Sequence, residues 1–183
     1  WSSDVCSSDL LAAKGSDAVQ KFLTESEKKY LEELSQKILD GNENTELIKT
    51  LSSLLKKGVG FHHAGLNQNC REIVETEFRN GNIKLLASTP TLAAGVNLPA
   101  RRVVILGVHR GVSEVEAYDI LQMVGRSGRL GIDPMGDAYI LVPESKEKQY
   151  RSMYSKSGRI DSQLLEINGD KYKTLAFHLV SEI

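Results

Sequence analysis

The chain has 183 residues, of which 40% are hydrophobic and 26% are charged, as is typical of one globular domain with a core. A formal net charge of −1 excludes binding of nucleic acid by bulk positive charge, so such binding would need local arginines, backbone amides and helix N-termini. The two cysteines are too few for a disulfide framework and lack Cys-x-x-Cys spacing. No apolar run approaches the roughly 20 residues of a membrane span, and the first residues do not have the pattern of a secretory signal. We expect a cytoplasmic or nuclear protein with no membrane partner.

The first 23 residues show little sign of regular structure. Residues 1–10 nearly repeat Ser-Ser-Asp followed by an aliphatic residue, a pattern without helical or strand periodicity. We expect residues 1–10 to be a non-native segment, and a native disordered tail is the alternative. Residues 11–23 contain only a short, broken apolar stretch.

Two amphipathic helices and a strand are predicted next. Thr24 and Glu27 have the spacing of a capping box, so a helix is expected to begin there and to end near Gly41. Its apolar face comprises Tyr30, Leu31, Leu34 and Ile38. A second helix over residues 47–55 ends in two lysines and a glycine, and residues 59–61 form a short strand.

The rest of the predicted domain alternates helices with apolar strands. Asn67 is expected to cap a third helix that ends at Gly81, with Cys70 as a small core residue. A further helix is predicted around residues 115–123, and strands are predicted at residues 83–87, 102–106 and 138–142. Strands that are apolar throughout and alternate with amphipathic helices indicate an α/β fold with a parallel sheet covered by helices on both faces.

The composition changes after Pro143. Residues 144–159 are polar and loop-like, and residues 160–183 read as two short helices broken at Asn168-Gly169. We place a domain boundary between residues 143 and 144 on this change.

The most specific segment for chemistry runs from Gln122 to Arg129, in the order Gln-Met-Val-Gly-Arg-Ser-Gly-Arg. Arg126 and Arg129 can face the same side of a turn, and the glycines let a charged group approach the backbone. A pair of guanidinium groups could neutralise charge that develops on a phosphoryl group during its transfer. A bare Gly-Arg-x-Gly-Arg stretch is more often a solvated loop, so its context decides.

Two upstream segments supply that context. Thr89 and Thr91 follow a buried strand and can offer hydroxyls and amides to a phosphate, although an ordinary capped loop is the alternative. Arg71 lies near a helix N-terminus, where it could hold a phosphate or be an exposed helix charge. His62 and His63 are adjacent on a strand and therefore point to opposite faces, so they are poor co-ligands and no metal site is predicted.

In this order and spacing, the His-His-Ala-Gly-Leu run at 62–66, the segment 89–99 and the Gly-Arg segment resemble motifs IVa, V and VI of the DExH-box helicases. The Gly-Val-Asn-Leu-Pro ending at 95–99 resembles the Ski-like branch of superfamily two, which includes archaeal repair helicases and eukaryotic RNA-exosome helicases. The resemblance covers about residues 58–142. It implies a RecA-like fold of the P-loop NTPase type, the second motor domain of such a helicase.

The resemblance also implies roles for the residues that match its motifs. It identifies Arg126 and Arg129 as catalytic arginines that reach the γ-phosphate of ATP. Contacts to the nucleotide would further involve Gln122, Gly95 and Asn97. The sugar-phosphate backbone of one strand would be held by Gly65, Arg71, Thr89 and Thr91.

The resemblance divides the chain into residues 1–10 outside the fold, 11–143 as the helicase C-terminal domain without its first strand, and 144–183 as a linker and the start of a winged-helix domain. The cofactor would be ATP with Mg²⁺. The phosphate cradle and the magnesium ligands are expected on the first RecA-like domain of the same full-length chain, because no Gly-x-x-x-x-Gly-Lys-[Ser/Thr] segment occurs here. This chain alone is therefore expected to be inactive.

The implied function is that of an ATP-dependent helicase or translocase acting on single-stranded or partly duplex nucleic acid, either DNA or RNA. The alternative is a non-enzymatic module that binds nucleic acid or a protein partner through a helicase-like fold.

Overall fold

The structure is a computed structural model, and it describes residues 3–89, 98–107, 109–110, 113–129 and 131–155. The chain divides into two compact units, Trp1–Leu141 and Val142–Ile183. The division lies close to the boundary predicted at 143/144.

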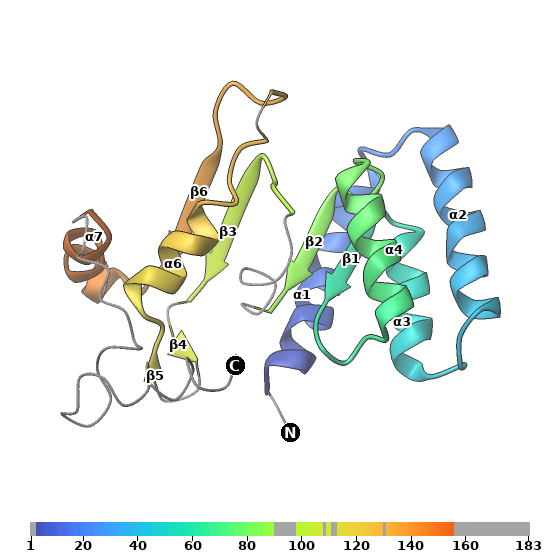
Figure 1. The fold of residues 1–183 in the computed structure, drawn as a ribbon, viewed down its shortest axis with the longest axis horizontal. Helices are drawn as coiled ribbons and strands as arrows, with labels where there is room; N and C mark the ends of the chain where they lie inside the picture. The colour runs from blue at the N-terminus through green and yellow to red at the C-terminus, as the bar shows by residue number, and fades with distance from the viewer. Residues whose placement is uncertain (1–2, 90–97, 108, 111–112, 130, 156–183) are drawn as a thin grey trace, which may run out of the picture. The chain divides into compact units, whose positions relative to one another are not determined.

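The main core of the first unit surrounds two parallel strands, β1 (Val59–His62) and β2 (Leu85–Ser88). Val59 pairs with Leu85 and His62 with Ser88, so both strands end at the same edge of the sheet. Figure 1 shows α4 (Gln68–Arg79) beside these strands, and β1 also contacts α3 (Glu46–Leu55). The helix α2 (Glu25–Asp40) lies further from the strands and packs on α3. The buried core comprises Ala12, Ile38, Ile48, Leu51, Leu54, Leu55, Val59, Phe61, Leu66, Cys70, Val74 and Ile83.

The structure contradicts one expectation, that residues 3–20 lack regular structure. Residues 3–20 form one helix, α1 (Ser3–Gln20), which contacts both β1 and β2. Its buried positions include Ser8, Ala12 and Ser16, four residues apart, and a methyl group at Gly15 would lie 2.8 Å from the Leu85 side chain. These small residues let the helix approach the strands closely. Because serine and glycine are not hydrophobic, the sequence shows no helical period of hydrophobic residues here. Residues 3–58 contain no strand.

The predicted helix starts are confirmed. The Thr24 hydroxyl accepts from the Glu27 amide, and the Glu27 carboxylate accepts from the Thr24 amide at 2.8 Å, which completes the capping box. Asn67 caps α4 by accepting from the Cys70 amide at 2.8 Å, and Cys70 is fully buried as predicted. Tyr30 differs from the prediction, because its ring is exposed and its hydroxyl donates to Glu77 at 2.9 Å.

Thr24→Ala is expected to lower the free energy of unfolding by about 1 kcal/mol, because it leaves an amide at the start of α2 without its acceptor. Urea denaturation of this chain measures the change. Thr50→Ala is the matched control: Thr50 lies inside α3, and its hydroxyl only donates back to the Glu46 carbonyl at 2.8 Å. Equal effects of the two substitutions would contradict a stabilising role of the cap.

A second parallel pair lies further along the chain and consists of β3 (Arg102–Leu106) and β6 (Asp137–Leu141). Its parallel pairing agrees with the predicted α/β class. Its burial does not agree, because four side chains that pair across one face are about half exposed, namely Val104, Leu106, Tyr139 and Leu141. Among the described residues, this face of the sheet therefore lacks the predicted helical cover.

The helix α6 (Ala117–Val124) contacts β3 and buries Ile120 completely. It follows a short antiparallel pair that was not predicted, β4 (His109–Arg110) with β5 (Ser113–Glu114). The end of α6 is the element that positions the Gly-Arg segment.

In the second unit, residues 144–155 are helical rather than loop-like. They form a 3-10 turn, η1 (Glu144–Lys146), and the helix α7 (Glu147–Ser155). Tyr150 and Tyr154 stack one helical turn apart, with ring centroids at 5.9 Å. The prediction missed this helix because most of the residues around the two tyrosines are polar or charged. The two helices predicted within residues 160–183 lie outside the described residues.

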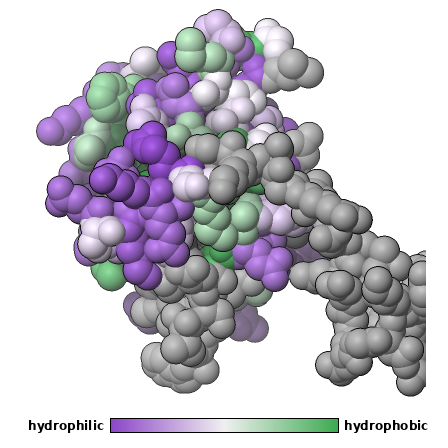
Figure 2. Space-filling view, turned by 90° about the vertical axis from the view of Figure 1, so that its left-hand side faces the viewer, coloured by the Kyte–Doolittle hydropathy of each residue, from purple (hydrophilic) through white to green (hydrophobic). Residues whose placement is uncertain are grey.

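One face of the molecule is mostly polar among the described residues. On the face shown in Figure 2, hydrophilic residues predominate among those coloured, and hydrophobic surface forms separate areas. None of the described helices is both long enough and apolar enough to cross a membrane.

Candidate functional site

The sequence-predicted arginines lie on a tight turn directly after α6, which we name the Gly-Arg turn (residues 125–129). The helix ends where the Gly125 amide donates to the Leu121 carbonyl at 2.9 Å, and the next two amides continue the coil by donating to Met123 and Val124. Gln122 lies on the last turn of α6. Gln122, Arg126 and Arg129 are thus carried by one short, hydrogen-bonded stretch of backbone.

The Gly-Arg turn is hydrogen-bonded to the chain just before β3. The Ala100 amide donates to the Arg126 carbonyl at 2.9 Å, and the Gly128 amide donates to the Ala100 carbonyl at 2.7 Å. Ala100 directly follows the predicted segment 89–99. The structure therefore brings the Gly-Arg turn against the end of that segment.

Two glycines allow a close approach between the Gly-Arg turn and the loop before β6. Gly128 has φ of +88°, a conformation that only glycine adopts without strain. A Cβ at Gly136 would lie 2.6 Å from the Ser127 carbonyl oxygen and would overlap the Gly128 backbone. The absence of a side chain at Gly136 therefore allows the two segments to approach, and sequence reasoning missed this role.

Gly136→Ala is expected to lower the free energy of unfolding by about 3 kcal/mol, because the methyl group must displace one of two backbone segments. Urea denaturation of the variant chain measures the effect. Gly81→Ala is the control, since Gly81 has φ of +78° but nothing within 4 Å of its would-be Cβ. That control measures a backbone cost alone, about 1 kcal/mol, whereas Gly136 has no positive φ and its substitution measures the steric cost. A smaller effect at Gly136 than at Gly81 would show that the close approach does not stabilise the turn.

Arg129 is held by an acidic partner that the sequence analysis did not identify. Its Nε donates to Asp133 Oδ2 at 2.8 Å and its Nη2 to Oδ1 at 2.9 Å. The hydrogen bonds from Arg129 hold the pKa of Asp133 at about 2, and the same carboxylate raises the pKa of Arg129. A carboxylate four residues after an arginine suggests pairing only within a helix. Asp133 lies outside the described helices, so the spacing alone does not indicate this pair.

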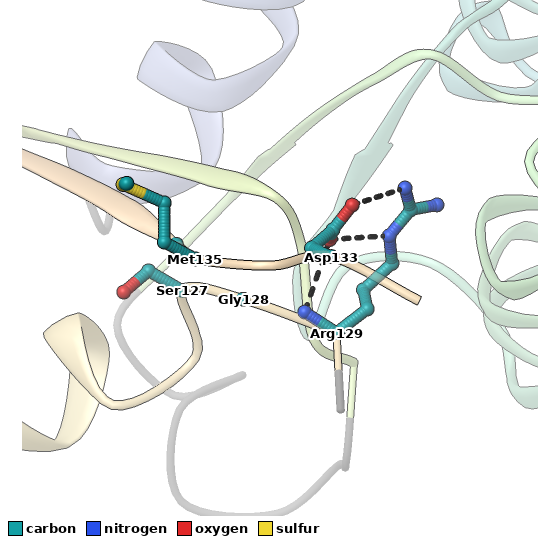
Figure 3. A pocket seen from close by; sticks show the side chains of 6 residues that line it. Ser127, Gly128, Arg129, Asp133 and Met135 are labelled. Carbon is teal, nitrogen blue, oxygen red and sulfur yellow. Dashed lines mark hydrogen bonds and ion pairs between the residues drawn. The ribbon is translucent and has the colours of Figure 1, made fainter. Parts of the chain in front are cut away.

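An open pocket lies at this turn, lined by Ser127, Gly128, Arg129, Asp133, Met135 and Gly136 (Figure 3). A guanidinium beside glycine backbone is suited to a phosphoryl group, because the forked donors match two oxygens and glycine leaves room for them. Within the described part of the chain, no group of three His, Cys, Asp or Glu side chains is arranged to hold a metal ion. The pocket thus places the guanidinium donors of Arg129, paired with the Asp133 carboxylate, beside glycine backbone.

Three other predicted residues lie along the carboxyl edge of β1 and β2. Thr89 directly follows β2, and its amide donates to the His62 carbonyl at the end of β1, at 3.3 Å. Gly65 follows β1 after two residues, and Arg71 lies in the first turn of α4. Because the strands are parallel, Gly65 and Thr89 come to the same edge of the sheet.

The two histidines have separate partners, as their alternation along the strand predicts. His62 Nε2 lies 2.8 Å from Glu75 Oε1 on α4. His63 is fully buried, stacks on Phe61 with centroids 5.2 Å apart, and its Nδ1 accepts from the Gly65 amide at 3.0 Å. Desolvation lowers the pKa of His63. The Gly65 amide is thus already hydrogen-bonded to His63 and is not the group that would bind a ligand. Because Gly65 has no side chain, its position could still leave room for one.

The remaining predicted site residues are Thr91, Gly95 and Asn97, and they lie outside the described residues.

Comparison with known proteins identifies the family. Residues 17–131 match the family model described as "Helicase conserved C-terminal domain". The chain is 38% identical over 168 residues to the ATP-dependent DNA helicase Hel308 of Methanococcus vannielii, which covers 89% of this chain and 22% of that protein. It is 38% identical over 155 residues to the ATP-dependent DNA helicase Hel308 of Caldivirga maquilingensis, covering 82% of this chain and 20% of that protein.

A plant protein is similar over much of the same region. The DExH-box ATP-dependent RNA helicase DExH13 of Arabidopsis thaliana is 38% identical over 153 residues, which cover 75% of this chain and 7% of that protein. The chain spans 22% of the length, or less, of each of these three relatives. The family model, the parallel α/β fold and the order of the motifs agree: the chain belongs to the helicase conserved C-terminal domain family of the superfamily-two helicases.

Proposed function

We propose that this chain is the second motor domain of an ATP-dependent nucleic-acid helicase or translocase of the Ski-like branch. The observation that carries the proposal is the Gly-Arg turn, which sets Arg126 and Arg129 on one hydrogen-bonded turn after α6 and beside Ala100. In the proposed enzyme, ATP with Mg²⁺ binds between this turn and the first RecA-like domain of the full-length chain. Arg126 and Arg129 stabilise the charge on the transferred phosphoryl group, and Gln122, Gly95 and Asn97 contact the nucleotide.

The proposed nucleic-acid contacts lie at the edge where β1 and β2 end. Gly65, Arg71, Thr89 and Thr91 hold the sugar-phosphate backbone of a single strand, which needs no base-specific groups. Three of them are described, and they come from two neighbouring strand ends and one helix N-terminus. Because the aromatic content is only 6%, base stacking is not the expected source of affinity. The proposed setting is the cytoplasm or nucleus.

Arg71→Ala in the complete protein is expected to weaken binding of a single-stranded oligonucleotide and to reduce its salt dependence. Loss of one phosphate contact lowers the slope of log K against log salt by about 0.7 for a single strand. Fluorescence anisotropy at several salt concentrations measures that slope. Arg79→Ala is the matched control, because Arg79 lies at the far end of α4, where its Nη2 is 3.7 Å from Glu75. An unchanged slope for Arg71→Ala would remove this residue from the interface.

The function is tested by strand separation. The complete protein, ATP and a partly duplex oligonucleotide with a labelled strand are mixed, and release of the label is followed. ATP-dependent release supports a helicase, whereas ATP hydrolysis and strand binding without release indicate a translocase that remodels nucleic-acid complexes. The 183-residue chain alone is expected to neither hydrolyse ATP nor release the strand, and hydrolysis by it that Arg129→Ala abolishes would contradict the proposed division between two motor domains.

A non-enzymatic binding module is the alternative function. It would use the same fold and the same arginines as simple anion contacts. A complete protein that binds a single strand but never hydrolyses ATP would establish it. The two Hel308 relatives are named DNA helicases and the plant relative an RNA helicase, so competition between DNA and RNA strands of one sequence must decide the substrate.

A further inference from the structure

Asp133 contacts Arg129 at three donors of the same residue. Besides the bonds from Nε and Nη2, the Arg129 backbone amide donates to Asp133 Oδ2 at 3.0 Å. Figure 3 shows the carboxylate between the backbone of Arg129 and one edge of its guanidinium. The carboxylate therefore fixes both the start and the end of the Arg129 side chain.

The carboxylate is itself anchored. Its side chain is only 5% exposed, and the Asp133 and Ile132 amides both donate to the Arg129 carbonyl, at 2.9 and 3.0 Å. The loop is closed against the Gly-Arg turn by the Gly128 and Gly136 contact. A carboxylate held in this way cannot follow the arginine if the guanidinium rotates, so the pair defines one orientation.

One edge of the guanidinium is left facing outward. The side chain carries five N–H donors, and the carboxylate engages the edge formed by Nε and Nη2. The third nitrogen, Nη1, points away from Asp133 (Figure 3), and the Arg129 side chain is 38% exposed. The outer edge made by Nη1 and Nη2 has the geometry to meet two phosphoryl oxygens.

We propose that Asp133 is a positioning residue that holds Arg129 with its outer guanidinium edge presented to the phosphoryl group of ATP. The inference rests on the proposed function and extends it to a residue that no motif prediction included. A guanidinium already held in place loses less rotamer freedom when the phosphoryl group binds, so its donors act in the transition state at lower cost. In the opposite mechanism, the carboxylate competes with the phosphoryl group for Arg129 and must release the guanidinium before ATP can bind it. That mechanism predicts faster ATP hydrolysis when Asp133 is removed.

The orientation is tested first on this chain by carboxyl NMR. The Asp133 titration midpoint is expected near 2 in the wild type and closer to 3.8, the ordinary value for aspartate, in Arg129→Ala. The stability that the pair contributes is then fully present above about pH 4 and is lost as the pH falls toward 2. A wild-type midpoint near 3.8 would overturn the pairing, whatever the enzyme assay shows.

The positioning role is tested in the complete protein by ATP hydrolysis. Asp133→Asn keeps the size of the side chain and removes its charge, and it is expected to lower kcat roughly 100-fold while KM for ATP changes less than about threefold. The double variant Asp133→Asn with Arg129→Ala is expected to be no slower than Arg129→Ala alone, because Asp133 acts only through that arginine. Asp137→Asn is the matched control, since it removes another aspartate–arginine pair, with Arg102 at 3.2 Å.

The outcomes separate this inference from the proposed function. Faster hydrolysis by Asp133→Asn would overturn positioning and support a competing carboxylate. If the fold-losses in kcat of the two single variants multiply in the double variant, Asp133 does not act through Arg129. Arg129→Ala could hydrolyse ATP at the wild-type rate although the Asp133 midpoint is near 2 in the wild type. That result would contradict the proposed contact of Arg129 with the phosphoryl group and would leave the orientation of Arg129 by Asp133 supported.

Discussion

Arg129→Ala in the complete protein is expected to lower kcat for ATP hydrolysis by about 10³–10⁵-fold, the range measured for arginines that stabilise phosphoryl transfer. The physical reason is that the guanidinium neutralises charge that appears only in the transition state, so its loss lowers kcat more than it raises KM. Steady-state hydrolysis with saturating single strand measures both constants. Arg126→Ala is expected to show a loss of the same kind, since it lies on the same turn.

Arg102→Ala is the control for that experiment. Arg102 is an exposed arginine on β3 whose side chain pairs with Asp137 and lies over the Tyr139 ring at 5.7 Å. Its removal tests whether loss of any arginine from this unit slows the enzyme. A loss of less than tenfold for Arg129→Ala, or an equal loss for Arg102→Ala, would show that Arg129 does not act on the transferred phosphoryl group.

Phe61→Ala is expected to lower the free energy of unfolding of this chain by about 3–5 kcal/mol. Phe61 is fully buried in β1, belongs to the main core and stacks on His63, so the substitution leaves a cavity in that core. A domain of ordinary stability has only about 5–15 kcal/mol to lose. The melting temperature should fall by roughly 10 °C, as followed by circular dichroism.

Phe22→Ala is the matched control, because Phe22 is 79% exposed and follows α1 without entering the core. Its expected effect is within about 0.5 kcal/mol. Equal destabilisation by the two substitutions would contradict the assignment of β1 to the core. Hydrolysis by the complete Phe22→Ala protein should remain at the wild-type level.

The elements with strong local signals were predictable from the sequence. Thr24 and Asn67 cap helices through their own side chains, so a few neighbouring residues determine where α2 and α4 begin. β3 was predicted with its observed bounds, because three consecutive branched residues favour a strand. Helix α1 was not predictable by hydrophobic period, since most of its buried positions are occupied by small residues such as Ser8, Ala12 and Ser16.

The candidate site was predictable only where it depends on the motif itself. Arg126 and Arg129 were found because two arginines and two glycines occupy consecutive positions of one turn. Asp133 and Gly136 were missed because their roles arise from contacts between the Gly-Arg turn and the loop before β6. No local sequence pattern indicates that this loop folds back onto the turn. The exposed face of β3 and β6 was equally unpredictable, since burial of a strand depends on which other segments pack against it.

The most direct measurement is ATP hydrolysis by the complete protein with and without a single-stranded oligonucleotide. If this chain is the second motor domain of a helicase, the protein hydrolyses ATP, the strand raises the rate, and Arg126→Ala abolishes the strand-stimulated rate. A protein that binds the strand but does not hydrolyse ATP under either condition would contradict the account and establish a nucleic-acid-binding module in its place.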